Sequence, residues 1–307
     1  MAMAELDYFV VDVFTDRALA GNPLAVVMNT CGLPTERMQA IAREFNLSET
    51  AFVERRPDAI EQVEGVRTRI FTAREELPFA GHPTLGTASV LKLHAPETVR
   101  DGVVTLRLNV GSVPVSFAAG DLFGEMTQRD PEFGEQLDFR EVARLTGLED
   151  EDLNAGLPPQ IVSTGTAFAI VVLRSDKPLA RLSVNQQEAV KWLSEHGARW
   201  FYVLGPASER TNSLTPEYRA RMQFYGGEDP ATGSAAGCAI SLLVLRGAVA
   251  AGKRVHVSQG VEINRPSDLY LSARMQSESR EAKSAKITDV RVAGSTVLVA
   301  TGRLFQS

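Results

Sequence analysis

The sequence predicts an α+β fold built from two similar domains. The chain has 307 residues, about twice the length of a common domain. Short β-branched and aromatic segments alternate with segments of helical periodicity. Two loops that begin 147 residues apart, at His82 and Asp229, share Pro, Gly and Ala at matching places. The same order of helix, strand, strand, loop, helix and hairpin surrounds both loops, which indicates a duplication.

The first half begins with a predicted hairpin. Two segments rich in β-branched and aromatic residues, 8–14 and 23–28, flank a stretch of turn residues. Apolar residues at helical spacing then predict a helix that opens at Pro34 and ends at Asn46. The other elements expected here are strands at 50–53, 67–71, 103–108 and 113–117 and a small-residue helix at 84–93.

The second half predicts a similar succession of elements. A helix is expected near 185–195, and an apolar helix follows the second loop and runs through Leu245. The expected strands lie near 160–163, 168–173, 200–204 and 219–224, and a last one near 295–305.

Composition and charge restrict the partners. Hydrophobic residues make up 44% and charged residues 23%, which excludes a disordered, collagen-like or coiled-coil chain. The formal net charge is −6 and the isoelectric point is near 5.4. Because such a chain repels polyphosphate and anionic lipid, we expect a small-molecule ligand, and neither a nucleic acid nor a membrane as partner.

The cysteines and histidines predict no metal site and a cytoplasmic protein. Cys31 and Cys238 are too few for a disulfide framework or a structural zinc site, so a reducing compartment is expected. His94, His196 and His256 lie far apart and have no metal-ligand spacing with Asp or Glu. The start of the chain does not have the pattern of a signal peptide, and no apolar run, including that near 240–245, is long enough to span a bilayer.

The two loops are the first candidate site. Pro at the first helical position, with His82 or Asp229 as the cap, is a typical helix start. The free amides of Gly86 and Thr87, and those of Gly233 and Ser234, would then form a cradle for a carboxylate. If both loops face one cleft, they hold a small acid. The structural alternative is that Asp229 only caps its helix and His82 is an ordinary histidine.

A third candidate is Glu49, in the segment 46–50 between a helix end and an apolar strand. A carboxylate beside apolar residues is partly desolvated, which favours its protonated form and suits a general acid or base. The alternative interpretation is a solvated glutamate in a loop.

Four segments together resemble the PhzF-like family of phenazine-biosynthesis isomerases, which are similar in fold to diaminopimelate epimerase. They are Gly21-Asn22-Pro23, Asn46-Leu47-Ser48-Glu49, 77–83 and 229–237, in the family's order and over nearly the whole chain. The resemblance implies two pseudo-symmetric domains, each a curved, mostly antiparallel or mixed sheet wrapped around a central helix, with the site between them. The N-terminal domain would comprise residues 1–127 joined by the strand at 295–307, and the C-terminal domain residues 128–294.

The resemblance also implies an activity and the residues for it. The family's enzyme isomerises trans-2,3-dihydro-3-hydroxyanthranilate with no cofactor and no metal. Its catalytic carboxylate corresponds to Glu49, which would remove a proton from one carbon and return it to another on the same face. His82 and Asp229 correspond to residues that face the substrate. The backbone of Gly81 and that of Gly233 and Ser234 correspond to the cradle for the substrate carboxylate.

Two other functions remain open at this point. Related epimerases place a cysteine on each of the two facing loops, whereas Cys31 precedes the first long helix and Cys238 lies within the second apolar helix. An epimerase or racemase of an amino or hydroxy acid would therefore have to use other groups. A non-catalytic protein that binds small acids is the third alternative, and the presence of Glu49 argues against it. The sequence leaves open whether the chain forms a homodimer.

Overall fold

The computed structural model describes residues 5–118, 120–208, 215–224, 227–276 and 286–305. The chain divides into two compact units, and each is described by itself. Unit 1 contains residues 1–127 and 293–307, and unit 2 contains residues 128–292.

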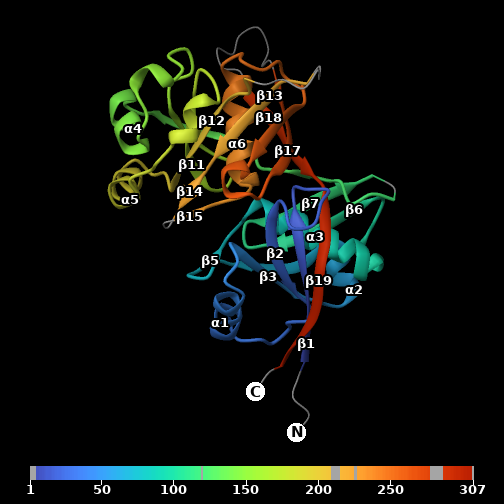
Figure 1. Ribbon diagram of the computed structural model, residues 1–307. Coiled ribbons are helices and arrows are strands. Elements are labelled where there is room, and N and C mark those ends of the chain that lie inside the picture. The colour runs from blue at the N-terminus through green and yellow to red at the C-terminus, as the bar shows by residue number, and fades with distance from the viewer. Residues whose placement is uncertain (1–4, 119, 209–214, 225–226, 277–285, 306–307) are drawn as a thin grey trace. The chain divides into compact units, whose positions relative to one another are not determined.

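Unit 1 is a mixed sheet with helices on both faces (Figure 1). Neighbouring strands follow the order β19, β1, β2, β3, β4, β6, β7, β8, and β5 pairs with β4; the β2–β3 and β4–β6 pairs are parallel and the others antiparallel. The strands are β1 (Glu5–Val13), β2 (Asn22–Val27), β3 (Glu49–Glu54), β4 (Val66–Phe71), β5 (Glu76–Leu77), β6 (Val103–Leu108), β7 (Gly111–Phe117), β8 (Gly124–Thr127) and β19 (Thr296–Phe305).

The central helix of unit 1 is α3 (Gly81–His94), and all of its residues from Gly81 to Leu91 are buried. Small residues allow α3 to lie close to the strands of the sheet. A Cβ on Gly86 would lie 2.7 Å from the side chains of Leu24 and Val13. On the other face of the sheet, α1 (Thr35–Phe45) packs on Val27 and Phe52 in a separate apolar cluster. The remaining helices are α2 (Asp58–Glu64) and the 3₁₀ turn η1 (Pro96–Thr98).

Unit 2 contains a second mixed sheet. Its strands pair in the order β9, β10, β11, β12, β13, β16, β17, with β11–β12 and β13–β16 parallel, and β14 and β15 form a separate pair. The strands are β9 (Glu132–Gln136), β10 (Gln160–Ser163), β11 (Ala167–Val172), β12 (Trp200–Pro206), β13 (Glu217–Arg221), β14 (Gln223–Phe224), β15 (Gly227–Glu228), β16 (Val255–Gln259), β17 (Ser267–Gln276) and β18 (Lys286–Gly294), whose last two residues belong to unit 1.

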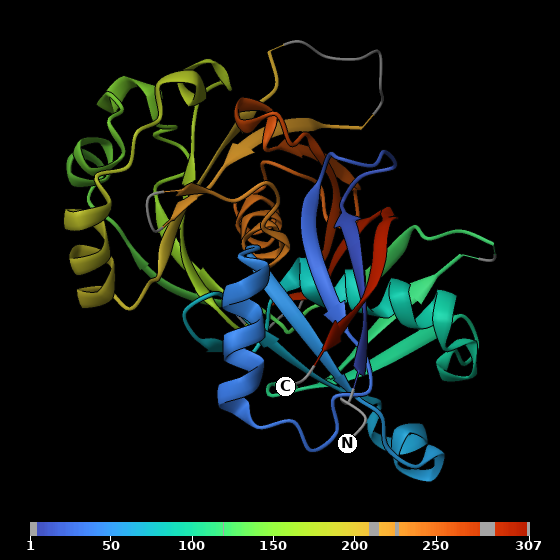
Figure 2. The same cartoon turned by 60° about the horizontal axis from the view of Figure 1, so that its bottom comes forward.

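The central helix of unit 2 is α6 (Gly233–Leu245), which is buried from Gly233 to Val244. Two further helices, α4 (Phe139–Thr146) and α5 (Gln186–Glu195), share an apolar cluster with Phe201 on the other face of the sheet (Figure 2). The 3₁₀ turns are η2 (Asp150–Asp152), η3 (Lys177–Arg181) and η4 (Val261–Ile263).

The two units repeat one topology. The succession antiparallel, parallel, antiparallel, parallel, antiparallel runs through β1, β2, β3, β4, β6, β7 in unit 1 and through β10, β11, β12, β13, β16, β17 in unit 2. The first parallel pair is connected through α1 or α5, and the second through α3 or α6. In register, Glu49 pairs with Leu24 as Trp200 pairs with Phe168. The predicted duplication is confirmed at the level of topology.

The predicted helix starts were wrong in both loops. Helix α3 begins at Gly81, with Ala80 as N-cap, so His82 and Pro83 lie inside its first turn. Proline is tolerated there because a first-turn amide needs no intrahelical partner. Helix α6 begins at Gly233 with Thr232 as N-cap, so Asp229 precedes the helix and does not cap it.

No helix in the described part of the chain is long and apolar enough to cross a membrane.

Candidate functional site

Glu49, His82 and Asn22 form a polar cluster in unit 1. Glu49 and Asn22 are the first residues of two neighbouring parallel strands, so they lie at the same end of the sheet. The His82 Nε2 atom lies 3.5 Å from Oε2 of Glu49. On the other side of the ring, Nδ1 lies 3.2 Å from the amide nitrogen of Asn22. The donor and acceptor roles in this pair depend on the tautomer of the neutral ring, and Nε2 is the ring nitrogen that lies toward Glu49.

His82 is buried as a neutral imidazole. Its side chain is 3% exposed and that of Glu49 is 16% exposed. Burial lowers the pKa of His82 to about 3, and a hydrogen bond with the backbone of Pro23 opposes this shift only in part. An ionised Glu49 would favour the imidazolium, but removal of the ring from water is the larger effect. The cluster therefore pairs a carboxyl group with an uncharged ring that can donate or accept a hydrogen bond.

The N-terminus of α3 lies in the same cluster, because His82 is its second residue. The amides of Gly81 and His82 belong to the first turn, where backbone N–H groups have no intrahelical acceptor. They can donate to an anionic group, and the helix dipole adds to that attraction.

The prediction that the amides of Gly86 and Thr87 are free to bind a carboxylate was wrong. Both residues lie in the second turn of α3, where the amide bonds to the carbonyl of the preceding turn. The Thr87 hydroxyl is fully buried and has no hydrogen-bond partner among the described residues. Only this hydroxyl remains as a donor or acceptor.

Asp229 lies in unit 2, in a buried network at the start of α6. Its side chain is 6% exposed, and Thr232 Oγ1 donates a hydrogen bond of 2.6 Å to its Oδ2. Its backbone N–H bonds to the carbonyl of Met222 at 2.8 Å. The preceding residue, Glu228, accepts from Nε of Arg221 at 2.9 Å. Asp229 is therefore held by hydrogen bonds at its side chain and its backbone.

The first turn of α6 contains Gly233 and Ser234, whose amides were expected to form a cradle. Ser234 is buried, 7% exposed, and the amides of this turn lie at the positive end of the helix. Beneath it, Gln128 Nε2 donates to the carbonyl of Gly233 at 2.9 Å, and Thr164 Oγ1 donates to Gln128 Oε1 at 2.7 Å. A Cβ on Gly237 would lie 1.9 Å from that same Oε1, so any other residue there would displace the Gln128 side chain.

The structure thus brings Glu49, His82 and Gly81 together in unit 1, and Asp229, Gly233 and Ser234 together in unit 2. Sequence reasoning assigned no role to three polar residues within these groups. Asn22 was noted only as part of a motif, although a buried amide beside a candidate histidine is a recognisable signal once the fold is known. Thr232 and Gln259 were missed because their partners are set by the sheet register.

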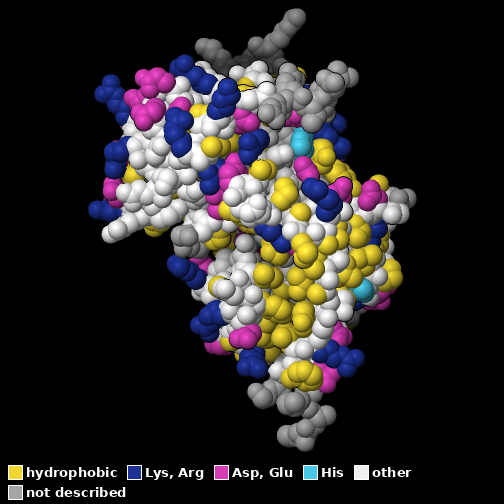
Figure 3. All heavy atoms as spheres, viewed as in Figure 1, with side chains coloured by type: hydrophobic (Ala, Val, Ile, Leu, Met, Phe, Trp, Pro, Cys, Tyr) yellow, Lys and Arg dark blue, Asp and Glu magenta, His cyan; other side chains and the backbone are white. Residues whose placement is uncertain are grey.

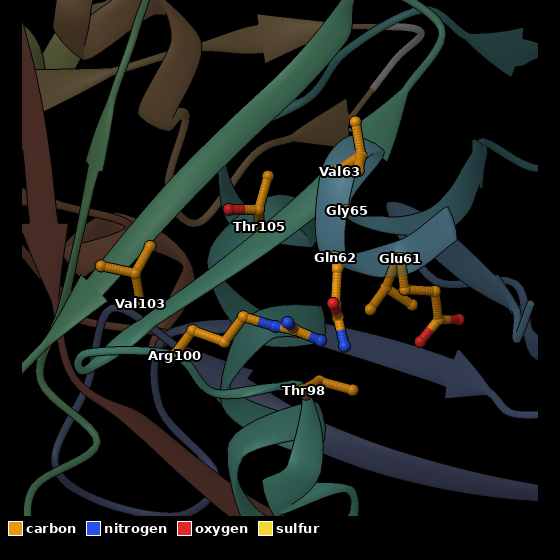
Figure 4. Close-up of a pocket in the computed structure, with 9 residues that line it drawn as sticks. Glu61, Gln62, Val63, Gly65, Thr98, Arg100, Val103 and Thr105 are labelled. Carbon is orange, nitrogen blue, oxygen red and sulfur yellow. The ribbon is translucent and has the colours of Figure 1, made fainter. Parts of the chain in front are cut away.

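One well-formed pocket lies outside both groups. It has a volume of about 140 Å³ in unit 1, beside α2 and β6, and the Arg100 side chain extends across it toward Gln62 (Figure 4). None of the candidate residues lines it. Within the described ranges no group of three or more His, Cys, Asp or Glu side chains could hold a metal ion.

The phenazine biosynthesis-like protein family matches residues 11–302. The chain belongs to this family. An uncharacterized isomerase of Mesorhizobium japonicum is 34% identical over 316 residues, which cover 99% of this chain and 100% of the relative. A trans-2,3-dihydro-3-hydroxyanthranilate isomerase of Pseudomonas aeruginosa is 33% identical over 308 residues, which cover 97% of this chain and 99% of the relative.

Solved structures agree with the family. A predicted epimerase from Pseudomonas aeruginosa superposes with a TM-score of 0.79 at 33% identity and covers 98% of this chain and 100% of its own. A hydroxyproline epimerase from Agrobacterium vitis, at 10% identity, has a TM-score of 0.61 over 98% of this chain and 92% of its own, which shows a shared fold alone. The predicted family and fold class are confirmed, and the chain is an enzyme of the isomerase class.

Proposed function

We propose that the chain isomerises a small cyclic or conjugated carboxylic acid by proton transfer between side chain and substrate. The first candidate substrate is trans-2,3-dihydro-3-hydroxyanthranilate, the compound in the name of the Pseudomonas aeruginosa relative. The observation that carries the proposal is the partly buried Glu49 carboxyl group beside a neutral His82 at the end of a sheet.

In the proposed reaction, Glu49 as carboxylate removes a proton from a carbon that conjugation has made acidic. The resulting acid then returns the proton to another carbon on the same face of the substrate, so one residue performs both steps. In this proposal His82 is neutral, and in the tautomer with its proton on Nε2 it donates a hydrogen bond toward the reacting region and stabilises the charge that forms there.

The substrate carboxylate would be bound by helix termini. The backbone of Gly81 in unit 1 and that of Gly233 in unit 2 supply first-turn amides, and Ser234 supplies a hydroxyl. Asp229 completes the proposed set as an acid, base or acceptor facing the substrate, and Thr87 through its buried hydroxyl. These groups can act on one substrate only if both units bind it. Substitutions in unit 1 and substitutions in unit 2 should therefore each change the turnover or the binding of the same substrate.

The test is isotope incorporation in heavy water. Wild type and Glu49→Gln are each given trans-2,3-dihydro-3-hydroxyanthranilate, and deuterium is followed by NMR. Glutamine keeps the shape of Glu49 and cannot accept a proton. We expect turnover to fall by at least about 10²–10⁴-fold, as for a lost general acid or base, while ligand binding persists.

Glu54→Gln is the matched control. Glu54 is the last residue of the same strand, β3, and lies 3.8 Å from Arg67, so it tests the loss of one carboxylate from that strand without touching His82. Full activity in Glu49→Gln, or an equal loss in both variants, contradicts the role of Glu49. Asp229→Asn and replacement of Ser234 by a bulky residue should weaken turnover or binding from unit 2, and unchanged behaviour of both removes unit 2 from the site.

Two further features belong to the proposal. The paucity of cysteine is the basis for a cytoplasmic location, which cell fractionation tests. Apolar side chains gather on unit 1 over β19 (Figure 3), where Leu298 and Phe305 are 36% and 62% exposed. A homodimer would cover such a surface, and sedimentation of wild type against Leu298→Lys measures whether it does.

A further inference from the structure

Gln259 is a buried amide whose hydrogen-bonding capacity is filled by one short segment and one tyrosine. It is the last residue of β16 and has no solvent exposure. Its Nε2 donates to the Asp229 carbonyl at 2.8 Å and to Thr232 Oγ1 at 3.0 Å. Its Oε1 accepts from the Thr232 amide at 3.1 Å and from the Tyr202 hydroxyl at 3.2 Å.

These contacts fix the direction of the Thr232 hydroxyl. The hydroxyl accepts a hydrogen bond from Gln259, and its own proton points to Oδ2 of Asp229 at 2.6 Å. The amide of Gln259 cannot be turned around, because its nitrogen would then face the Thr232 N–H, which only donates, and its oxygen would face the Asp229 carbonyl, which only accepts. The contacts of Gln259 with Thr232 therefore direct the Thr232 hydroxyl to donate its proton to the Asp229 carboxylate.

The backbone around Gln259 leaves little freedom to adjust. Gln259 pairs with Ala220 on one side and Ser267 on the other, in the interior of the sheet. The next residue, Gly260, has φ +76°, and a Cβ there would lie 2.7 Å from the carbonyl oxygen of Pro230. The strand end thus packs directly on the segment that carries Asp229.

We propose that Gln259 is a positioning residue that orients the Asp229 carboxylate through the Thr232 hydroxyl. The inference rests on the proposed function, in which Asp229 faces the substrate. Gln259 itself touches no reacting atom. Its effect on the reaction must therefore pass through Thr232, and this route separates a positioning role from a merely structural one.

Three variants separate the contacts. Gln259→Glu keeps the oxygen that accepts from Thr232 and Tyr202 and replaces the donating nitrogen, so that Thr232 can donate to position 259 instead of Asp229. Thr232→Val removes the hydroxyl and keeps the side-chain shape. Tyr202→Phe is the matched control, because it removes one hydrogen bond to Gln259 and leaves the bonds through Thr232 in place.

Kinetics with trans-2,3-dihydro-3-hydroxyanthranilate then give the first measurement. We expect Gln259→Glu and Thr232→Val each to lower kcat by about 10- to 100-fold, the range for a lost hydrogen bond to a charged group, with KM changed less than threefold. The double variant should be no worse than about threefold below the poorer single variant, because both act on the same hydroxyl. Tyr202→Phe should keep kcat within about threefold.

The second measurement does not depend on turnover. In protein with carbon-13 in its aspartate carboxyl groups, the Asp229 signal, assigned with Asp229→Asn, should move in Thr232→Val and Gln259→Glu and stay in Tyr202→Phe. A wild type that does not convert the substrate overturns the proposed function, while this signal still decides the role of Gln259. An unmoved Asp229 signal in folded Gln259→Glu, or losses of kcat that multiply in the double variant, overturns the positioning role.

Discussion

The charge of His82 can be read from the pH dependence of stability. In the folded protein burial lowers the pKa of His82 to about 3, whereas an unfolded histidine has a pKa of about 6.5. Above about pH 6.5 both states are neutral and His82 adds no pH dependence. As the pH falls below this value, the unfolded state binds a proton that the folded state does not, so the free energy of unfolding decreases.

The magnitude follows from the two pKa values. At pH 5 the unfolded imidazole is largely protonated and the folded one is not, which destabilises the folded state by about 2 kcal/mol relative to pH 7. The variant His82→Gln has no such proton. Its stability should therefore decline less between pH 7 and pH 5, and the difference between wild type and variant should change by about 2 kcal/mol.

The measurement must report on unit 1. Trp192 and Trp200 both lie in unit 2, so tryptophan fluorescence follows the other part of the chain. A urea titration read by pulse-labelled hydrogen exchange in peptides from α3 follows unit 1 itself. The control is His94→Gln, at the exposed C-terminal end of the same helix, which should leave the pH dependence of unit 1 close to that of wild type.

A constant difference between wild type and His82→Gln from pH 7 to pH 5 would refute the reasoning. That result would mean that folded His82 binds a proton as readily as the unfolded chain, as an imidazolium paired with Glu49. The proposed hydrogen-bond donor would then be a cation, and the charges proposed for Glu49 and His82 would need to be reassigned.

Two more predictions concern α6. Gly237→Ala should destabilise unit 2 by about 2–5 kcal/mol in urea, because the new methyl group displaces Gln128 from two buried hydrogen bonds. Adding Gln128→Ala to this variant should bring little further loss of stability. The control is Gly156→Ala, whose new methyl group meets nothing closer than 3.4 Å. An additive double variant would contradict this. Burial raises the pKa of Cys238 to about 12. At pH 8 iodoacetamide should therefore alkylate only the exposed Cys31 until urea unfolds the chain, as mass spectrometry of the peptides would show. Rapid labelling of Cys238 in the folded protein would contradict its burial.

Sequence periodicity predicted the duplication and many of the elements, but helices α2 and α4 and strands β9, β16, β17 and β18 were not predicted. Hairpin, helix and strand followed from local patterns, and Asn46 ends α1 in the left-handed conformation at φ 49°, as its position predicted. Helix starts were not predictable to the residue, because Pro83 is compatible with any position in the first turn.

The candidate site was predictable only where one segment contains it. Glu49 stands at a recognisable junction between a helix end and an apolar strand. The distance from Glu49 to His82 depends on the packing of α3 against β3, and neither residue encodes it locally. Gln259 has no local signal at all, since an isolated glutamine at a strand end is common, and only the pairing of β16 places it beneath Asp229.

The repeated topology has an evolutionary consequence. The position in β12 that corresponds to Glu49 in register is Trp200, and the sequence repeat aligns His82 with Asp229. The strand position therefore carries a carboxyl group in one unit and an indole in the other. If Glu49 transfers the proton as proposed, substitutions in unit 2 can alter which acid is accepted while this carboxyl group in unit 1 stays in place. A protein of this kind can therefore gain a new substrate while the proposed proton transfer by Glu49 stays the same.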